Sequence, residues 1–309
     1  MTSALPPGPQ RVQIQTQSGC NGRCVFCPNE ETLKAGISQG KMPETLFQKI
    51  IDDLAQTNPN RVSLYLMNEP MADKRLPEFI QYTAERIPET STLVTTNGTY
   101  LNEERAEAMI NAGLKRLKVS LQSLDPERNR EIMGYSSEKV IEGVLATKRV
   151  MDRMRSKKFD LRVSMVVTKQ NRGEISEARK FWRRHGVRLV TSALENRGGN
   201  IANAEEMNDG EMKLRDNCIR PSREMCILYN GDVALCCVDW HRRVILGNVA
   251  ERHVAQVWND HPVEQIRQGF RERKAELLPD LCLNCTESAC ADGHRRGIRS
   301  LFRKLAASF

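Results

Sequence analysis

Strand-like and helix-like segments alternate through the first two thirds of the chain, and this alternation limits the possible folds more than any other feature. Six short runs rich in β-branched and aliphatic residues lie within residues 10–194, each followed by turn residues. The expected strands are Arg11–Thr16, Arg61–Leu66, Thr92–Thr95, Leu117–Leu121, Leu161–Val167 and Val187–Thr191. Helical periodicity lies between them, as where Leu46, Ile50 and Leu54 follow Pro43. The pattern predicts an α/β protein with a parallel sheet, doubly wound or barrel-like, with six units instead of the eight of a closed barrel.

The pattern changes after residue 200, where seven of the ten cysteines are found. The segment Cys226–Cys236 predicts a β-hairpin, because its Asn230–Gly231 pair is the strongest short turn signal. A basic amphipathic tail ends the chain; we expect it to pack on the barrel, with attachment to a membrane surface as the alternative. The expected divisions are a partial barrel over 1–200, a small cysteine-rich domain over 201–293 and the tail over 294–309.

The composition points to a metalloprotein of the cytoplasm. No apolar run is long enough to cross a bilayer, and the first residues lack the charged and apolar regions of a signal peptide. Thiols stay reduced in the cytoplasm, so ten cysteines there indicate metal binding instead of disulfides. The net charge of +8 is spread along a chain with only 5% aromatic residues. This favours an anionic small-molecule site and solvated faces over a nucleic-acid surface.

The first cysteine group is a C-x3-C-x2-C loop directly after the first expected strand. Cys20, Cys24 and Cys27 can hold three irons of a four-iron cluster and leave the fourth iron open. An open coordination position is what a catalytic metal requires. The alternative is a zinc site that lacks its fourth ligand, and no histidine lies nearby in the sequence to complete it.

This loop, with Phe26 before its third cysteine, resembles the radical S-adenosylmethionine (SAM) superfamily. The resemblance implies a partial (β/α)6 barrel, a 4Fe-4S cluster that cleaves SAM to a 5′-deoxyadenosyl radical, and a flavodoxin- or ferredoxin-type reductant. Met67 and Asn68 stand where the family motif has glycines, and Asn97 can also be a plain turn residue before Gly98. The positions that the resemblance assigns to SAM are Phe26, Asn68, Glu69, Asn97, Ser120 and Gln122.

The second cysteine group resembles the SPASM and twitch domains, which bind auxiliary 4Fe-4S clusters. Its ligands would be Cys218, Cys236, Cys282 and Cys285, with Gly231 four residues before Cys236. Four thiolates close a cluster, so it would transfer electrons and not bind SAM. A structural zinc site of four cysteines is the alternative. We expect one auxiliary cluster; the remaining cysteines are Cys226, Cys237 and Cys290.

Two further segments, 192–200 and 236–285, resemble aminocyclitol dehydrogenases of the same superfamily, although the middle of this chain, 125–158, is longer. The resemblance implies oxidation of an alcohol carbon in a small polar substrate such as an aminocyclitol or sugar. Arg197 would line the substrate pocket, or form an ordinary ion pair with Glu195, which could itself be the base. A thiol-dependent epimerase, a peptide-modifying enzyme and a non-catalytic scaffold remain alternatives.

Overall fold

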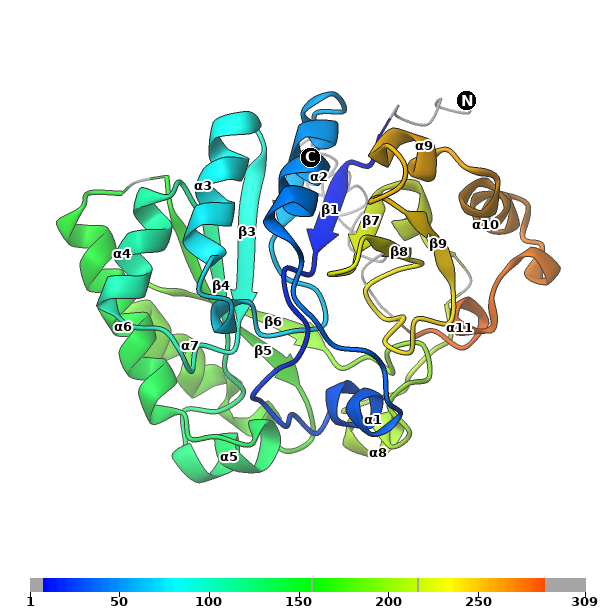
Figure 1. Cartoon of the computed structure of the whole chain (residues 1–309). Coiled ribbons are helices and arrows are strands. Elements are labelled where there is room, and N and C mark those ends of the chain that lie inside the picture. Colours follow the sequence, from blue (N-terminus) through cyan, green and yellow to red (C-terminus); the bar gives the residue numbers. More distant parts are fainter. Residues whose placement is uncertain (1–7, 157, 216, 287–309) are drawn as a thin grey trace, which may run out of the picture.

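The computed structural model describes residues 8–156, 158–215 and 217–286, and its centre is one nine-stranded sheet (Figure 1). The strand order is β6-β5-β4-β3-β2-β1-β7-β8-β9, with β6 and β9 at its two ends, so the sheet is not closed. Neighbouring strands from β6 through β1 are parallel, which confirms the six expected strand–helix units. These strands are β1 (Arg11–Ile14), β2 (Arg61–Ser63), β3 (Ser91–Thr96), β4 (Arg116–Ser120), β5 (Asp160–Val167) and β6 (Arg188–Ala193).

Helices cover one face of the parallel strands and others gather where these strands end (Figure 1). The covering helices are α2 (Glu44–Ala55), α3 (Leu76–Arg86), α4 (Glu103–Asn111), α6 (Glu138–Arg153) and α7 (Ile175–Arg184). At the carboxyl ends of the strands lie α1 (Asn29–Lys34), α5 (Pro126–Met133) and α8 (Ala204–Met207). Short 3-10 turns are η1 (Pro70–Ala72), η2 (Arg172–Glu174), η3 (Arg220–Ser222) and η4 (Ala275–Leu277). Within the described ranges, none of the helices combines the length and apolar character of a membrane span.

The main core lies between the sheet and the covering helices. Val12, Val62 and Leu117 from the strands are fully buried there with Phe47 and Ile50 of α2. Because side chains alternate along a strand, the strand residues next to Val12, Val62 and Leu117 point to the opposite face of the sheet, here called the inner face. The helices are fixed locally as well: the Oδ1 atom of Asn102 accepts a hydrogen bond of 2.9 Å from the backbone N–H of Arg105 and caps α4.

The cysteine-rich segment continues the same sheet. Strand β7 (Glu224–Ile227) pairs in parallel with β1, and β8 (Asp232–Ala234) and β9 (Ile245–Asn248) follow in antiparallel order. The expected hairpin is confirmed, and Gly231 in its turn has the left-handed φ of 89° that favours glycine. The segment also contributes α9 (Val254–Trp258), α10 (His261–Glu272) and α11 (Asp280–Leu283). Its strands and the barrel strands thus share one hydrogen-bonded ladder.

Candidate active site

The loop that carries the first three cysteines is held by the end of α5. The backbone N–H groups of Arg23 and Val25 donate to the carbonyl oxygens of Met133 and Ile132, at 3.0 and 2.9 Å. Gly134 ends α5 with a φ of 84°, and a Cβ there would lie 3.2 Å from the backbone nitrogen of Arg23. Glycine is therefore required both by its conformation and by the close approach of the loop.

The three thiols of this loop are half-buried and lie near one another. The pKa of Cys20 is raised to about 11: burial is the main cause, the charges of Glu69 and Cys27 add to it, and hydrogen bonds from Gly22 and Asn97 oppose it. Burial also raises the pKa of Cys24, followed by the charges of Cys27 and Cys20. Such thiols ionise when a cation neutralises them, so the donor set fits an iron–sulfur cluster. Among the described residues, no three metal-ligating side chains converge as closely as one bound ion would require.

Glu69 lies directly behind this loop and is 1% exposed. Its carboxylate accepts hydrogen bonds from the Thr96 hydroxyl at 2.6 Å, the Asn97 N–H at 2.7 Å and the Met71 N–H at 2.9 Å. Burial raises the pKa of Glu69, and the three donors oppose that shift. The backbone N–H of Glu69 also donates to the carbonyl of Gly19 at 2.9 Å. The carboxylate is thus fixed next to the cysteines, with one of its roughly four acceptor positions left.

The two residues that replace motif glycines behave differently. Met67 keeps a glycine-like backbone, with a left-handed φ of 51°. Asn68 uses Oδ1 to accept a hydrogen bond of 2.9 Å from the Leu66 N–H. Its Nδ2 group is buried and has no hydrogen-bond partner in the described part of the chain. A buried unpaired donor is costly, so Asn68 is suited to a ligand oxygen such as those of SAM.

Asn97 serves the turn and also faces the cysteine loop. Its Oδ1 accepts from the Thr99 N–H at 3.0 Å, and its Nδ2 donates to the Asn21 side chain at 2.7 Å and lies 3.7 Å from the Cys20 sulfur. Gln122 is buried, and its Oε1 accepts a hydrogen bond of 2.7 Å from the Val166 N–H, which ties the end of β4 to β5. The side-chain carbonyl of Gln122 is therefore occupied by a hydrogen bond within the fold, and its amide nitrogen is the group left for a ligand. Ser120 is half-buried at the end of β4, in register with Ser164 of β5.

Tyr135 is a site residue that the sequence did not indicate. Its hydroxyl donates to the Asn97 carbonyl at 3.3 Å. Burial raises its pKa, and the charges of Cys24, Glu69 and Cys20 raise it further, which puts the ring among these groups. Phe26 lies nearby in a separate apolar cluster with Ile132, Met133, Leu194, Ile201 and Ala204. Tyr135 belongs to the lengthened middle of the chain, where no motif marked it.

Glu195 and Arg197 follow shortly after the end of β6. The Arg197 Nη1 and Glu195 Oε2 atoms are 4.0 Å apart, and Arg197 has a left-handed φ of 53°. Burial raises the pKa of Cys27, while the charge of Arg197 lowers it, so this guanidinium also faces the cysteine loop. The ion pair with Glu195, which was the alternative to a substrate-binding role, is present at this distance, and the substrate-binding role of Arg197 stays a prediction.

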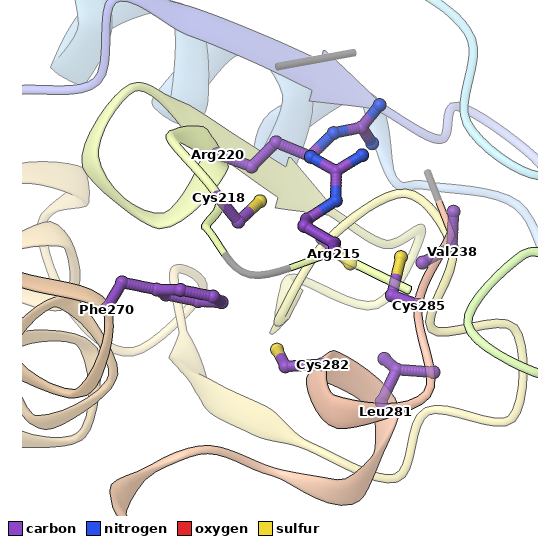
Figure 2. A pocket seen from close by; sticks show the side chains of 9 residues that line it. Arg215, Cys218, Arg220, Val238, Phe270, Leu281, Cys282 and Cys285 are labelled. Atoms are coloured by element: carbon purple, nitrogen blue, oxygen red, sulfur yellow. The ribbon is translucent and has the colours of Figure 1, made fainter. Parts of the chain in front are cut away.

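The four cysteines of the second group line a single cavity (Figure 2). Figure 2 shows Cys218, Cys282 and Cys285 on different sides of this cavity. The other lining residues are Cys236, Arg215, Arg220, Val238, Phe270 and Leu281. Four thiols around one space, with two guanidinium groups to balance thiolate charge, fit a closed iron–sulfur cluster.

The surplus cysteines do not line that cavity where the structure describes them. Cys226 is 1% exposed and packs with Leu66, Leu228 and Ala234. Cys237 accepts a hydrogen bond from the Arg220 guanidinium. Cys290 and the expected tail over 294–309 lie outside the described residues.

Comparison with known families agrees with this geometry. Residues 14–181 match the Radical SAM superfamily, and residues 218–286 match SPASM, an iron–sulfur cluster-binding domain. The first match covers more than half of the chain, so the protein belongs to the radical SAM superfamily. It is an iron–sulfur enzyme that requires a 4Fe-4S cluster and SAM. Its SPASM domain is of the kind that binds auxiliary iron–sulfur clusters.

Particular relatives cover different parts of the chain. The S-adenosyl-L-methionine-dependent 2-deoxy-scyllo-inosamine dehydrogenase of Niallia circulans is 23% identical over 279 residues, 89% of this chain and 91% of that protein. The GTP 3′,8-cyclase of Aquifex aeolicus is 31% identical over 58% of this chain, which spans about half the length (54%) of that enzyme.

Solved structures share the fold. BtrN in complex with AdoMet and 2-DOIA has a TM-score of 0.61 at 20% identity, covering 93% of this chain and 95% of BtrN. Streptococcus suis SuiB bound to precursor peptide SuiA has a TM-score of 0.69 at 19% identity, covering 91% of this chain and 70% of SuiB. The expected radical SAM fold with a SPASM-type segment is confirmed.

Proposed function

We propose that this enzyme dehydrogenates an alcohol carbon of a small polar substrate, such as an aminocyclitol or sugar, and delivers one electron to an auxiliary 4Fe-4S cluster. The observation that carries the proposal is the cavity lined by Cys218, Cys236, Cys282 and Cys285. Four protein ligands leave no iron open, so a cluster there is suited to accept an electron. The likeness to a dehydrogenase over nine tenths of both chains supports this assignment.

The loop cysteines Cys20, Cys24 and Cys27 would hold the catalytic cluster. With SAM bound, that cluster supplies a 5′-deoxyadenosyl radical that removes one hydrogen atom from the substrate. Glu69 would accept hydrogen bonds from the SAM ammonium, and the free Nδ2 of Asn68 would donate to a SAM oxygen. We also assign contacts with SAM to Phe26, Asn97, Ser120 and Gln122, in the last case through its amide nitrogen.

The substrate hydroxyl must lose a proton as its carbon is oxidised. We assign Arg197 to orient that hydroxyl, because a guanidinium is always charged and stabilises a developing oxyanion. Glu195, whose Oε2 atom lies 4.0 Å from Nη1 of Arg197, would accept the proton. The balance is then complete: one hydrogen atom goes to the radical, one proton to Glu195 and one electron to the auxiliary cluster. A flavodoxin- or ferredoxin-type protein would supply the electron that starts each cycle.

Glu69 gives the first prediction. Glu69→Gln removes the charge that faces the SAM ammonium, so SAM affinity should fall roughly 10- to 100-fold, the value of a charged hydrogen bond of about 1.5–3 kcal/mol. Thr96→Val is the matched control, because it removes one donor to Glu69 but leaves the carboxylate charged. Equilibrium dialysis of SAM against the reconstituted enzyme measures both, with iron content checked. Equal affinities for wild type and Glu69→Gln would refute the assignment.

Product mass tests the proposed reaction directly. A dehydrogenase yields a product lighter by two hydrogens, and turnover in heavy water leaves no non-exchangeable deuterium at the oxidised carbon. An epimerase, which requires a thiol to return hydrogen, yields an isomer with one deuterium at carbon. Cys226 is ill suited to that role, since it is buried in the sheet. An isomeric, labelled product would overturn the dehydrogenase proposal.

A further inference from the structure

Two arginines line the cavity of the second cysteine group (Figure 2). Arg215 and Arg220 stand on either side of Cys218 in the chain, so the segment that carries this cysteine also brings both guanidinium groups to the cavity. Apart from the cysteines, the other described side chains of the wall are apolar: Val238, Phe270 and Leu281. Little water can screen a charge in such a wall, so each guanidinium acts strongly on any charge inside the cavity.

The fold fixes the position of Arg220. This residue is 8% exposed, and its Nη1 atom donates a hydrogen bond to the sulfur of Cys237. Its Nε atom lies 3.9 Å from Oε2 of Glu224 in β7. The same carboxylate pairs with Arg11 of β1 at 3.0 Å, so it is shared between two guanidinium groups. Arg220 is therefore a buried cation that contacts with the sheet hold beside the cavity.

Arg215 is anchored through its backbone. Its N–H donates to the carbonyl oxygen of Cys285 at 2.9 Å, which ties this arginine to one of the four cavity cysteines. The Nε and Nη1 atoms of its side chain are buried. The charge of Arg215 thus belongs to the wall of the cavity, and it is held there by a different part of the chain from the one that holds Arg220.

The two guanidinium groups act on different cysteines. Burial raises the pKa of Cys236, and the charge of Arg220 opposes this rise. The pKa of Cys282 is raised to about 12, mainly by burial, and the charge of Arg215 opposes it. Asp239 acts on Cys282 in the opposite sense, but it does not line the cavity and already accepts hydrogen bonds from two backbone N–H groups. The positive charges therefore face the sulfur atoms from two sides.

We propose that Arg215 and Arg220 raise the reduction potential of the cluster that the four cavity cysteines hold, and so make it a better electron acceptor. Reduction adds a negative charge to a site that already carries its thiolates, and a fixed guanidinium stabilises the added charge. The apolar part of the wall has the opposite effect, because a poorly solvated site disfavours additional charge. Arginine suits this role because it stays charged when buried. The inference rests on the proposed function, since it concerns the acceptor of the substrate electron.

The test is a redox titration of the anaerobically reconstituted full chain without substrate, followed by electron paramagnetic resonance. The auxiliary signal is the one that added SAM leaves unchanged. Arg220→Gln should lower its midpoint potential by about 59 mV or more, which is a tenfold or greater loss in the equilibrium constant for one-electron reduction. Arg220→Lys keeps the charge and should lower the potential less than Arg220→Gln. Arg223→Gln is the matched control, because Arg223 is exposed and outside the lining, and it should leave the potential nearly unchanged.

Arg215→Gln is a second, independent variant and should also lower the potential. It keeps the test decisive if Arg220→Gln fails to assemble the cluster, which iron and sulfide analysis would show. Arg220→Gln leaves Glu224 paired with Arg11, so assembly is expected.

Three outcomes would overturn the proposal: equal potentials for wild type and the assembled glutamine variants, an equal shift in Arg223→Gln, or an equal shift in Arg220→Lys. The last would mean that the positive charge is not the cause. Failure of the proposed reaction is distinguishable, because the potential is measured without substrate and the reaction is judged by product mass. An isomeric product together with lowered potentials would refute dehydrogenation and support the role of the two arginines.

Discussion

Alanine at Cys20, Cys24 and Cys27 together should abolish SAM cleavage while the protein keeps about half of its iron. Two four-iron clusters give about eight irons per chain, and this variant removes the ligands of only one. The auxiliary cavity draws none of its lining from residues 18–28, so it should assemble independently. Iron and sulfide analysis of anaerobically reconstituted protein, with detection of 5′-deoxyadenosine, measures both results.

Cys226→Ala is the matched control for the triple variant. Cys226 is a buried thiol that packs with Leu66 and Leu228 and lines neither site, so its loss should cost some stability but no iron. Full iron content and SAM cleavage are expected to persist. Stoichiometric zinc in place of iron in the anaerobically purified wild-type protein would contradict the assignment of both sites.

Replacing Cys282 and Cys285 with alanine should separate radical formation from oxidation. The double variant should still produce 5′-deoxyadenosine slowly, since the first cysteine loop is intact, but it should form no oxidised product. The reason is the electron count: removal of a hydrogen atom takes one electron from the substrate, and the second then has no acceptor. Mass spectrometry of substrate and nucleoside products after reduction gives both readings.

The structure indicates that this variant will fold. The segment with Cys282 and Cys285 is also held by hydrogen bonds to Asn196, whose N–H donates to the Thr286 hydroxyl at 2.9 Å and whose Nδ2 donates to the Asn284 carbonyl at 2.8 Å. A lower melting temperature is still expected, because metal binding contributes to folding. Cys237→Ala, next to a cavity cysteine but outside the lining, is the control and should oxidise substrate. Equal product from the double variant would exclude an acceptor role.

Much of this fold could be predicted from the sequence, because strands and the cysteine loop are marked by residues that are close together in the chain. Runs such as Leu161–Val167 identify strands by composition, and Cys20, Cys24 and Cys27 are close in space because they are close in the chain. Contacts between distant segments left no such pattern. The Thr96 and Asn97 donors to Glu69, the placement of Tyr135 and the pairing of β7 with β1 all depend on tertiary packing.

Strand register is a second feature that the sequence does not reveal. Arg11 and Arg61 are each an ordinary polar position in an alternating strand, and the parallel pairing of β1 with β2 places them directly opposite one another.

The pairing of β7 with β1 also has a consequence for synthesis of the chain on the ribosome. Arg11 and its partner Glu224 are 213 residues apart, so at about 5–20 residues per second roughly 10–40 s separate their synthesis. During that interval one edge of β1 has no β7 to cover it, and an uncovered edge is a template for pairing with other chains. A nascent or truncated chain that stops before residue 224 keeps that edge open. Strand β7 therefore protects the first strand of the barrel from association with other copies.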